Sequence, residues 1–294
     1  MTLDQTFRFL DLDAETELHG IEAFFPAWNA GEHVAFFSPH DDDAMLGAGY
    51  LMLAAQAAGA VAHLVIFHRG NAGYSKPTDK ETIVEVRKKE TVASYRGLGI
   101  SQNNILRLDL PDFSGNAYLG MFKPVQPGQD QSTGTFERLL VFLRKSKVSR
   151  LVFANGFREH IDHAAVAQSA ILYGPQAGDP VVVDWAEPWT IQSFIEYSVW
   201  GNFDPVESIR RSAEKNHLPA NRAIIANEAA EQKIQSALQQ FHSQQAIIKG
   251  ILENRKERKI DQGYLELYMQ VDPRPKLDYN PYKQSINHIL KKKK

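Results

Sequence analysis

The stretch His33–Ser38, HVAFFS, is an apolar run that is followed at once by Pro39 and the polar run His40–Asp43. A short run rich in β-branched and aromatic residues is typical of a buried strand, and proline disfavours regular pairing beyond it. Residues 44–58 are rich in Ala, Leu and Met and predict a helix, which ends before Gly59. The sequence thus predicts a strand–turn–helix unit with His and Asp in its turn.

The alternation of strand and helix continues through the first half of the chain. Further strands are expected at 61–68, 104–110 and 150–154, and helices at 80–98, 135–147 and 163–173. This order implies parallel strands joined by right-handed crossovers. We therefore expect an α/β fold, a Rossmann-like three-layer sandwich with a mostly parallel sheet and helices on both faces. The second half is less regular and predicts a strand at 190–200 and one long helix at 227–250.

Composition limits the classes of function. The 294 residues carry a formal net charge of -2, which gives no reason to expect nucleic acid as a partner. There is no cysteine, so a metal site must use His and carboxylate ligands. The N-terminal residues lack a signal-peptide pattern, and no apolar run approaches the roughly 18–20 residues of a membrane span. We expect a cytoplasmic protein with no membrane span, and we interpret Lys291–Lys294 as a solvated tail.

The ends of the predicted strands carry the candidate chemistry. In open parallel sheets a ligand binds beyond the carboxyl ends of the strands, so the residues that follow Ser38, His68, Leu110 and Ala154 should share one crevice. Gly- and Pro-rich residues 111–134 follow one of these ends, and we interpret them as a lid in preference to a disordered loop.

Two clusters of His and Asp converge at this edge. His40–Asp43 follow the first strand, and His160, Asp162 and His163 follow the strand at 150–154. Three consecutive carboxylates repel one another unless a cation or hydrogen bonds compensate them. Together the two clusters predict a divalent-metal site.

These motifs resemble the LmbE-like, or PIG-L, family of N-acetylglucosaminyl deacetylases. That family has His-Pro-Asp-Asp-(Glu/Asp) after its first strand and His-Pro-Asp-His later. This chain has His40-Asp41-Asp42-Asp43 and His160-Ile161-Asp162-His163 at the matching places. Weaker matches are Gly47–Gly49, Arg87 with Glu90, Leu110–Asp112 and His242–Gln244. The resemblance spans roughly residues 32–250 and implies a single domain, 1–294, with residues 251–294 as a C-terminal extension.

The resemblance implies a metal site made of His40, Asp43 and His163. A set of three protein ligands leaves a coordination position for water, and His and Asp ligands suit Zn²⁺ or another divalent metal such as Fe²⁺. Asp42 matches the family's general base, which takes a proton from the water that the metal activates.

The second motif implies two more catalytic residues. His160 matches the residue that stabilises the oxyanion when protonated, and Asp162 is expected to orient His160 and raise its pKa. One departure is Asp41, which stands where the family usually has proline, and which we interpret as a solvated turn residue.

Three residues are candidates for substrate binding, and each has an alternative or a reservation attached. Arg87 could instead pair with Glu90 on its helix. Asp112 begins the expected lid, and Arg158 stands where some family members have tyrosine. Other residues left open are His68, a pocket contact or a strand-end residue, and the tryptophans Trp185, Trp189 and Trp200, which could stack on a sugar or belong to the core.

The implied function is removal of an acetyl group from an N-acetylglucosamine-type amide by metal-activated water with an Asp base. The expected partner is a small N-acetylated sugar or sugar conjugate, and a homo-oligomer stays open. The alternatives are an amidase on another small N-acyl compound, a magnesium-dependent phosphate-ester hydrolase and a non-catalytic sugar-binding relative. The phosphate reading is disfavoured because His ligands suit magnesium poorly and no basic cluster awaits a phosphate.

Overall fold

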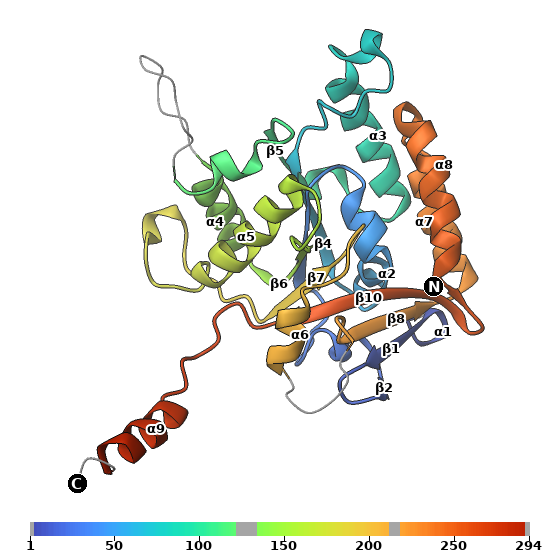
Figure 1. Cartoon of the computed structure of the whole chain (residues 1–294). Coiled ribbons are helices and arrows are strands. Elements are labelled where there is room, and N and C mark those ends of the chain that lie inside the picture. Colours follow the sequence, from blue (N-terminus) through green and yellow to red (C-terminus); the bar gives the residue numbers. More distant parts are fainter. Residues whose placement is uncertain (1–2, 122–133, 212–217, 292–294) are drawn as a thin grey trace, which may run out of the picture.

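The computed structural model describes residues 3–121, 134–211 and 218–291 (Figure 1). Much of the expected lid, residues 122–133, and the end of the lysine tail, residues 292–294, lie outside these ranges. The described residues form one ten-stranded sheet in the order β2-β1-β8-β10-β7-β6-β3-β4-β5, with β9 paired to β10. No helix in the described ranges combines the length and the hydrophobicity needed to cross a bilayer.

One half of the sheet is parallel and confirms the strands expected from the first half of the sequence. The pairs β3–β4, β3–β6, β4–β5 and β6–β7 are all parallel. Of these strands, β3, β4, β6 and β7 are almost fully buried, as parallel strands covered by helices on both faces must be, and β5 at the edge of the sheet is partly buried. Their bounds are β3 His33–Ser38, β4 Val61–His68, β5 Ile105–Leu110, β6 Val148–Ala154 and β7 Ser193–Tyr197.

The other half of the sheet is antiparallel, so the expectation of a mostly parallel sheet is wrong. The long strand β10 lies between β7 and β8 and is antiparallel to both, and β1 is antiparallel to β8 and β2. The expected C-terminal extension, residues 251–294, thus supplies a strand in the interior of the sheet. The bounds are β1 Phe7–Asp11, β2 Thr16–Leu18, β8 Arg222–Ala226, β9 Lys259–Ile260 and β10 Gly263–Val271.

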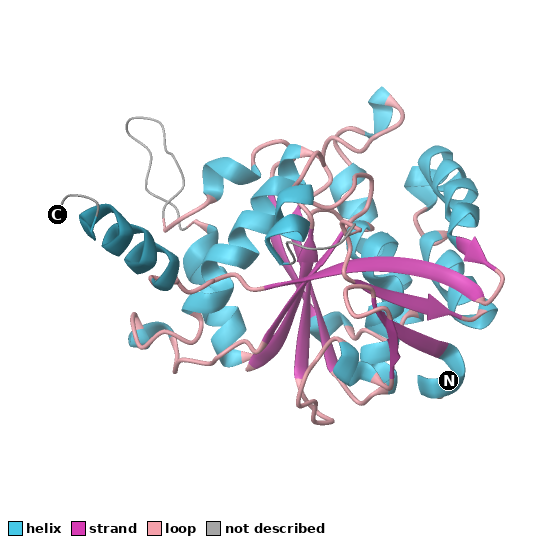
Figure 2. Cartoon of the chain, turned by 60° about the horizontal axis from the view of Figure 1, so that its bottom comes forward, coloured by secondary structure: helices cyan, strands magenta, loops and turns pink. Residues whose placement is uncertain are grey.

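Helices cover both faces of the sheet (Figures 1 and 2). The pair α4 and α5 packs on β6 and β3 from one side, and α2, α3 and α7 form the layer on the other side. The helix α9 carries no buried residue and projects away from the sheet. The bounds are α1 Leu3–Thr6, α2 Asp43–Ala57, α3 Ile83–Gly97, α4 Thr135–Lys145, α5 Ile161–Gln176, α6 Pro205–Arg211, α7 Glu228–Leu238, α8 Gln245–Asn254 and α9 Asn280–Lys291.

The single helix expected at 227–250 is wrong, because the chain turns between α7 and α8. Phe241 in this turn is buried in the core. Ser243 then donates two hydrogen bonds to Glu90 of α3, and Gln244 Nε2 donates to the carbonyl of Gly73. These tertiary contacts override a local sequence preference for helix.

The helix α2, which follows the His40–Asp43 turn, is kinked at Ala48, where φ is -136° and ψ is 24°. Side chains from the C-terminal part of the chain pair the backbone groups near this kink. Tyr50 N donates to Glu266 Oε2 at 2.8 Å, and Leu51 N donates to the hydroxyl of Tyr268 at 3.1 Å. The kink is therefore held by β10.

Before the kink, the carbonyl of Leu46 accepts hydrogen bonds from two arginines. Arg258 Nη2 donates at 2.7 Å and Arg255 Nη1 at 3.3 Å. Both guanidinium groups are neutralised by buried carboxylates, Arg255 by Glu231 and Arg258 by Glu266. The backbone groups of Leu46, Tyr50 and Leu51 near the kink are thus paired with charged or hydroxyl side chains.

We predict that Tyr268→Phe lowers the free energy of unfolding by about 1–3 kcal/mol, because it leaves the buried N–H of Leu51 without its acceptor. Tyr264→Phe is the matched control on the same strand, since the Tyr264 hydroxyl donates to the exposed Glu228. That change should cost less than about 1 kcal/mol. Urea unfolding of both variants measures the difference, and equal losses would contradict the role given to Tyr268.

Candidate metal and active site

The four strand ends expected to share a crevice meet at the carboxylate of Asp162. This side chain is fully buried. His40 Nε2 lies 3.1 Å from Asp162 Oδ2, and His68 Nε2 lies 3.2 Å from Oδ1. The backbone N–H of Phe113 donates to Oδ2 at 2.9 Å. Residues at or just after the ends of β3, β4, β5 and β6 therefore converge on one carboxylate, which confirms that these four strand ends meet.

His40, Asp43 and His163 come together as a candidate metal site. His40 Nδ1 lies 3.1 Å and His163 Nε2 lies 3.4 Å from the same oxygen, Asp43 Oδ2. One ligand atom from each residue lies within 4.8 Å of the others. The site is built by β3, the first turn of α2 and the first turn of α5. Two imidazoles and one carboxylate form a donor set that zinc and iron accept.

A second set, His40, His160 and Asp162, also lies within 4.8 Å, so the two sets compete for His40. The first set fits a metal better. Behind it, Asp162 faces the Nε2 atom of His40, and Glu159 Oε2 lies 3.4 Å from His163 Nδ1. Histidine ligands usually direct their second nitrogen to a carboxylate in this way. In the second set Asp162 would have to serve as ligand and as outer partner at once.

Burial and charge shift the pKa values of the site in opposite directions. Burial opposes protonation of His40, but the hydrogen bonds to Asp162 and Asp43 outweigh it and raise the pKa of His40 to about 10. Burial would raise the pKa of Asp43, yet His163 and His40 hold it well below its ordinary value. Burial and the neighbouring Asp43 carboxylate raise the pKa of Asp42. A carboxylate with a raised pKa beside one that stays ionised is a pattern of general acid–base sites.

The PIG-L family model, described as GlcNAc-PI de-N-acetylase, matches residues 35–173, which include both His/Asp motifs. Residues 35–173 are therefore similar to the PIG-L family. The resemblance inferred from the motifs is thereby confirmed. A search of curated proteins found no match.

Solved structures share the fold of this chain at low sequence identity. The conserved protein TT1542 from Thermus thermophilus has a TM-score of 0.60 and 20% identity over 84% of this chain and 98% of its own. The N,N'-diacetylchitobiose deacetylase from Pyrococcus horikoshii has a TM-score of 0.60 and 18% identity over 82% and 84%. GalB, the 4-carboxy-2-hydroxymuconate hydratase from Pseudomonas putida, has a TM-score of 0.59 and 16% identity over 84% and 99%. The fold alone therefore does not decide the reaction.

His160 of the second PIG-L motif caps α5. Its Nδ1 accepts a hydrogen bond from the backbone N–H of Asp162 at 3.3 Å, so the neutral ring carries its proton on Nε2. Burial lowers the pKa of His160, and the positive His40 adds to this effect against the attraction of Asp162. Asp162, 3.5 Å from His160 Nδ1, raises this pKa as expected, but burial outweighs its effect and the net shift is downward.

Asp41, which replaces the family proline, is fully buried, so its interpretation as a solvated turn residue is wrong. Arg87 Nε lies 2.9 Å from its Oδ2, Arg107 Nη1 bonds its Oδ1, and Thr91 Oγ1 donates to Oδ1 at 2.7 Å. The two arginines neutralise the carboxylate beneath the metal-site turn. Two arginines on elements distant in sequence make burial of this aspartate possible.

The three side chains expected to bind substrate differ in burial and in their partners. Arg87 is buried, with Nη2 3.6 Å from Asp42 Oδ1, so it faces the expected base from below. Asp112 accepts hydrogen bonds from Gly70 N and Ala72 N and shapes the loop after β4. Arg158 is exposed and lies over the ring of Phe157. Arg87 is thus buried, Asp112 is half-buried and Arg158 is exposed.

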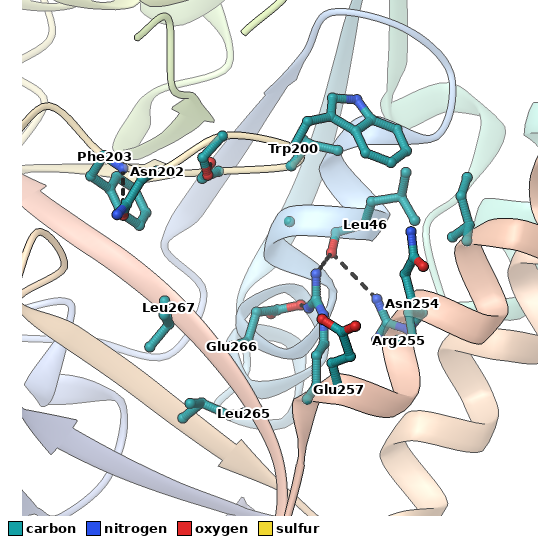
Figure 3. A pocket seen from close by; sticks show the side chains of 16 residues that line it. Leu46, Trp200, Asn202, Phe203, Asn254, Arg255, Glu257, Leu265, Glu266 and Leu267 are labelled. Carbon is teal, nitrogen blue, oxygen red and sulfur yellow. Dashed lines mark hydrogen bonds and ion pairs between the residues drawn. The ribbon is translucent and has the colours of Figure 1, made fainter. Parts of the chain in front are cut away.

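A cavity of about 510 Å³ lies on the β7–β10 side of the same sheet edge (Figure 3). Leu46, in the first turn of α2, forms part of its wall, and Trp200, which is 57% exposed, forms another part. Trp200 is therefore not a core residue, and it is available to stack on a ligand. Trp185 packs instead against Phe136 beside the core.

Sequence reasoning missed Glu159 and Arg107, and left His68 undecided. His68 is fully buried against Asp162. Glu159 stands four residues before His163, which is a spacing that could have indicated a carboxylate–histidine pair. Arg107 lies in β5, but nothing in the local sequence indicates that its partner is Asp41.

We predict that Asp41→Ala lowers the free energy of unfolding by about 3–5 kcal/mol, because it removes the fully buried carboxylate that Arg87 and Arg107 share. Asp109→Ala is the control, since Asp109 pairs with the same Arg107 at 3.1 Å but is 42% exposed. Its loss should stay below about 1 kcal/mol. Chemical denaturation measures both, and a small effect at Asp41 would contradict the buried ion cluster.

Proposed function

We propose that this PIG-L protein is a divalent-metal-dependent hydrolase that removes an acetyl group from the amide nitrogen of an N-acetylglucosamine-type sugar. The observation that carries the proposal is the convergence of His40, Asp43 and His163, with a carboxylate behind each histidine. The family description, GlcNAc-PI de-N-acetylase, and the fold shared with a diacetylchitobiose deacetylase support the same reaction.

A metal ion held by these three residues would polarise the acyl carbonyl and make a water molecule easier to deprotonate. Zn²⁺ suits the donor set, as does Fe²⁺. With three protein ligands, the site keeps room for water and the carbonyl oxygen.

Asp42 is the proposed base. Its raised pKa suits a group that accepts the proton of the attacking water and then passes it to the departing nitrogen. The carbon–nitrogen bond breaks as the carbon–oxygen bond of acetate forms, and the free amine leaves. Arg87, 3.6 Å from Asp42, helps to fix the position of the base.

His160 is the proposed oxyanion donor, acting as a neutral ring. Its Nδ1 is occupied by the backbone N–H of Asp162, so the proton on Nε2 is the one available to a ligand. Asp162 serves His40 and His68 more directly than it serves His160. We therefore propose Asp162 as an outer partner of the metal site.

A second candidate is an amidase that acts on another small N-acyl compound. It is favoured because two of the three expected sugar contacts bond to other groups of the protein. Arg87 pairs with Asp41, and Asp112 accepts hydrogen bonds from backbone N–H groups. Arg158 remains the proposed substrate contact. A small-molecule partner, a cytoplasmic location and a homo-oligomer remain predictions.

We predict that the purified protein binds one equivalent of Zn²⁺ or Fe²⁺ and releases acetate from at least one member of a panel of N-acetylated sugars. His40→Ala should lose both properties. Asp42→Asn should keep the metal and lose about 10²–10⁴-fold in rate, the usual contribution of a general base. Metal analysis and an enzymatic acetate assay measure these outcomes.

His288→Ala is the control, because His288 is exposed on α9, and it should match the wild type. Release of acyl groups from non-sugar amides alone would favour the amidase. Bound metal without hydrolysis of any N-acyl compound would contradict the proposed function.

A further inference from the structure

Glu159 lies in the turn between β6 and α5, and its side chain is fully buried. Arg158 just before it has a positive φ of 55°, an uncommon conformation for a residue with a side chain. One carboxylate oxygen, Oε1, accepts four hydrogen bonds from the loop that follows β7. The donors are Ser198 Oγ at 2.8 Å, Val199 N at 3.0 Å, Trp200 N at 3.0 Å and Gly201 N at 2.8 Å.

The other oxygen, Oε2, faces the candidate metal site. It lies 3.4 Å from His163 Nδ1, within ion-pair range. Within the described ranges, neither of these two buried atoms has a hydrogen-bond partner by strict geometry. His163 Nε2 points the opposite way, to Asp43 Oδ2 at 3.4 Å. The imidazole of His163 thus lies between two carboxylates, one on each nitrogen.

We propose that Glu159 is a positioning residue that holds the proton of His163 on Nδ1 and so keeps the Nε2 lone pair directed at the metal. This inference rests on the proposed function, because it assumes that His163 is a metal ligand. A carboxylate behind a histidine ligand fixes the tautomer and the ring orientation, and makes the nitrogen that binds the metal more basic.

The chemistry of the loop alone does not require this side chain to face His163. The four donors are all served by Oε1, so a loop cap would leave Oε2 buried without a partner, at a cost of about 1–3 kcal/mol. An N–H on His163 Nδ1 supplies that partner. The buried carboxylate is thus satisfied at both oxygens only if His163 carries its proton on the side away from Asp43.

The same carboxylate also connects the metal site to the cavity of Figure 3. Ser198, Val199, Trp200 and Gly201, which donate to Oε1, all line that cavity. Glu159 therefore links one wall of the cavity to one ligand of the metal site through a single rigid group.

The test is Glu159→Gln in the full-length protein. If the amide oxygen stays with the four loop donors, the amide NH₂ faces His163 Nδ1, and the ring must place its proton on Nε2, where the metal would bind. We expect the affinity for Zn²⁺, measured by competition with a chelator, to fall about 10–100-fold. Glu257→Gln is the control, because Glu257 lines the same cavity but is exposed and belongs to the segment before β9, and its affinity should match the wild type.

The outcomes separate this inference from the proposed function. A wild-type protein that binds no Zn²⁺ overturns the metal site itself. A wild type that binds Zn²⁺ and a folded Glu159→Gln variant of equal affinity overturn the role of Glu159 alone. If the variant does not fold, ¹⁵N NMR of the zinc-free wild type, at a pH where the ring of His163 is neutral, decides the question: a proton on His163 Nδ1 supports the inference, and a proton on Nε2 overturns it.

Discussion

The buried carboxylate of Asp162 is the contact on which the site depends. It contacts His40, His68 and the backbone N–H of Phe113, which come from three different strand ends. A buried charge is costly unless it is fully paired, so this convergence constrains the positions of all four loops. The crevice is thereby defined before any ligand arrives, and His40 is oriented toward Asp43 by the carboxylate behind it.

The run of three aspartates is tolerated because each carboxylate has its own environment. Asp41 is neutralised by Arg87 and Arg107 beneath the turn. Asp43 lies between two histidines. Burial and the charge of Asp43 raise the pKa of Asp42, which faces Arg87 at 3.6 Å. One short turn therefore combines a buried, ion-paired aspartate with the proposed metal ligand Asp43 and the proposed base Asp42.

The sequence predicted the parallel half of the fold, since its strands are continuous apolar runs and its helices follow in order. The edge rule for parallel strands then brought His40 and His163 together, although their roles came from the family resemblance. The antiparallel half was missed, because pairing of β10 with β7 and β8 joins segments far apart in the chain and leaves no local pattern. The partners of Asp41 and Glu159 were missed for the same reason.

Anomalous X-ray scattering at the zinc edge, from crystals of the protein loaded with Zn²⁺, tests the central claim most directly. We expect one peak within about 2.0–2.2 Å of a nitrogen of His40, an oxygen of Asp43 and a nitrogen of His163. A peak bound instead by His40, His160 and Asp162, or no peak in this crevice, would contradict it.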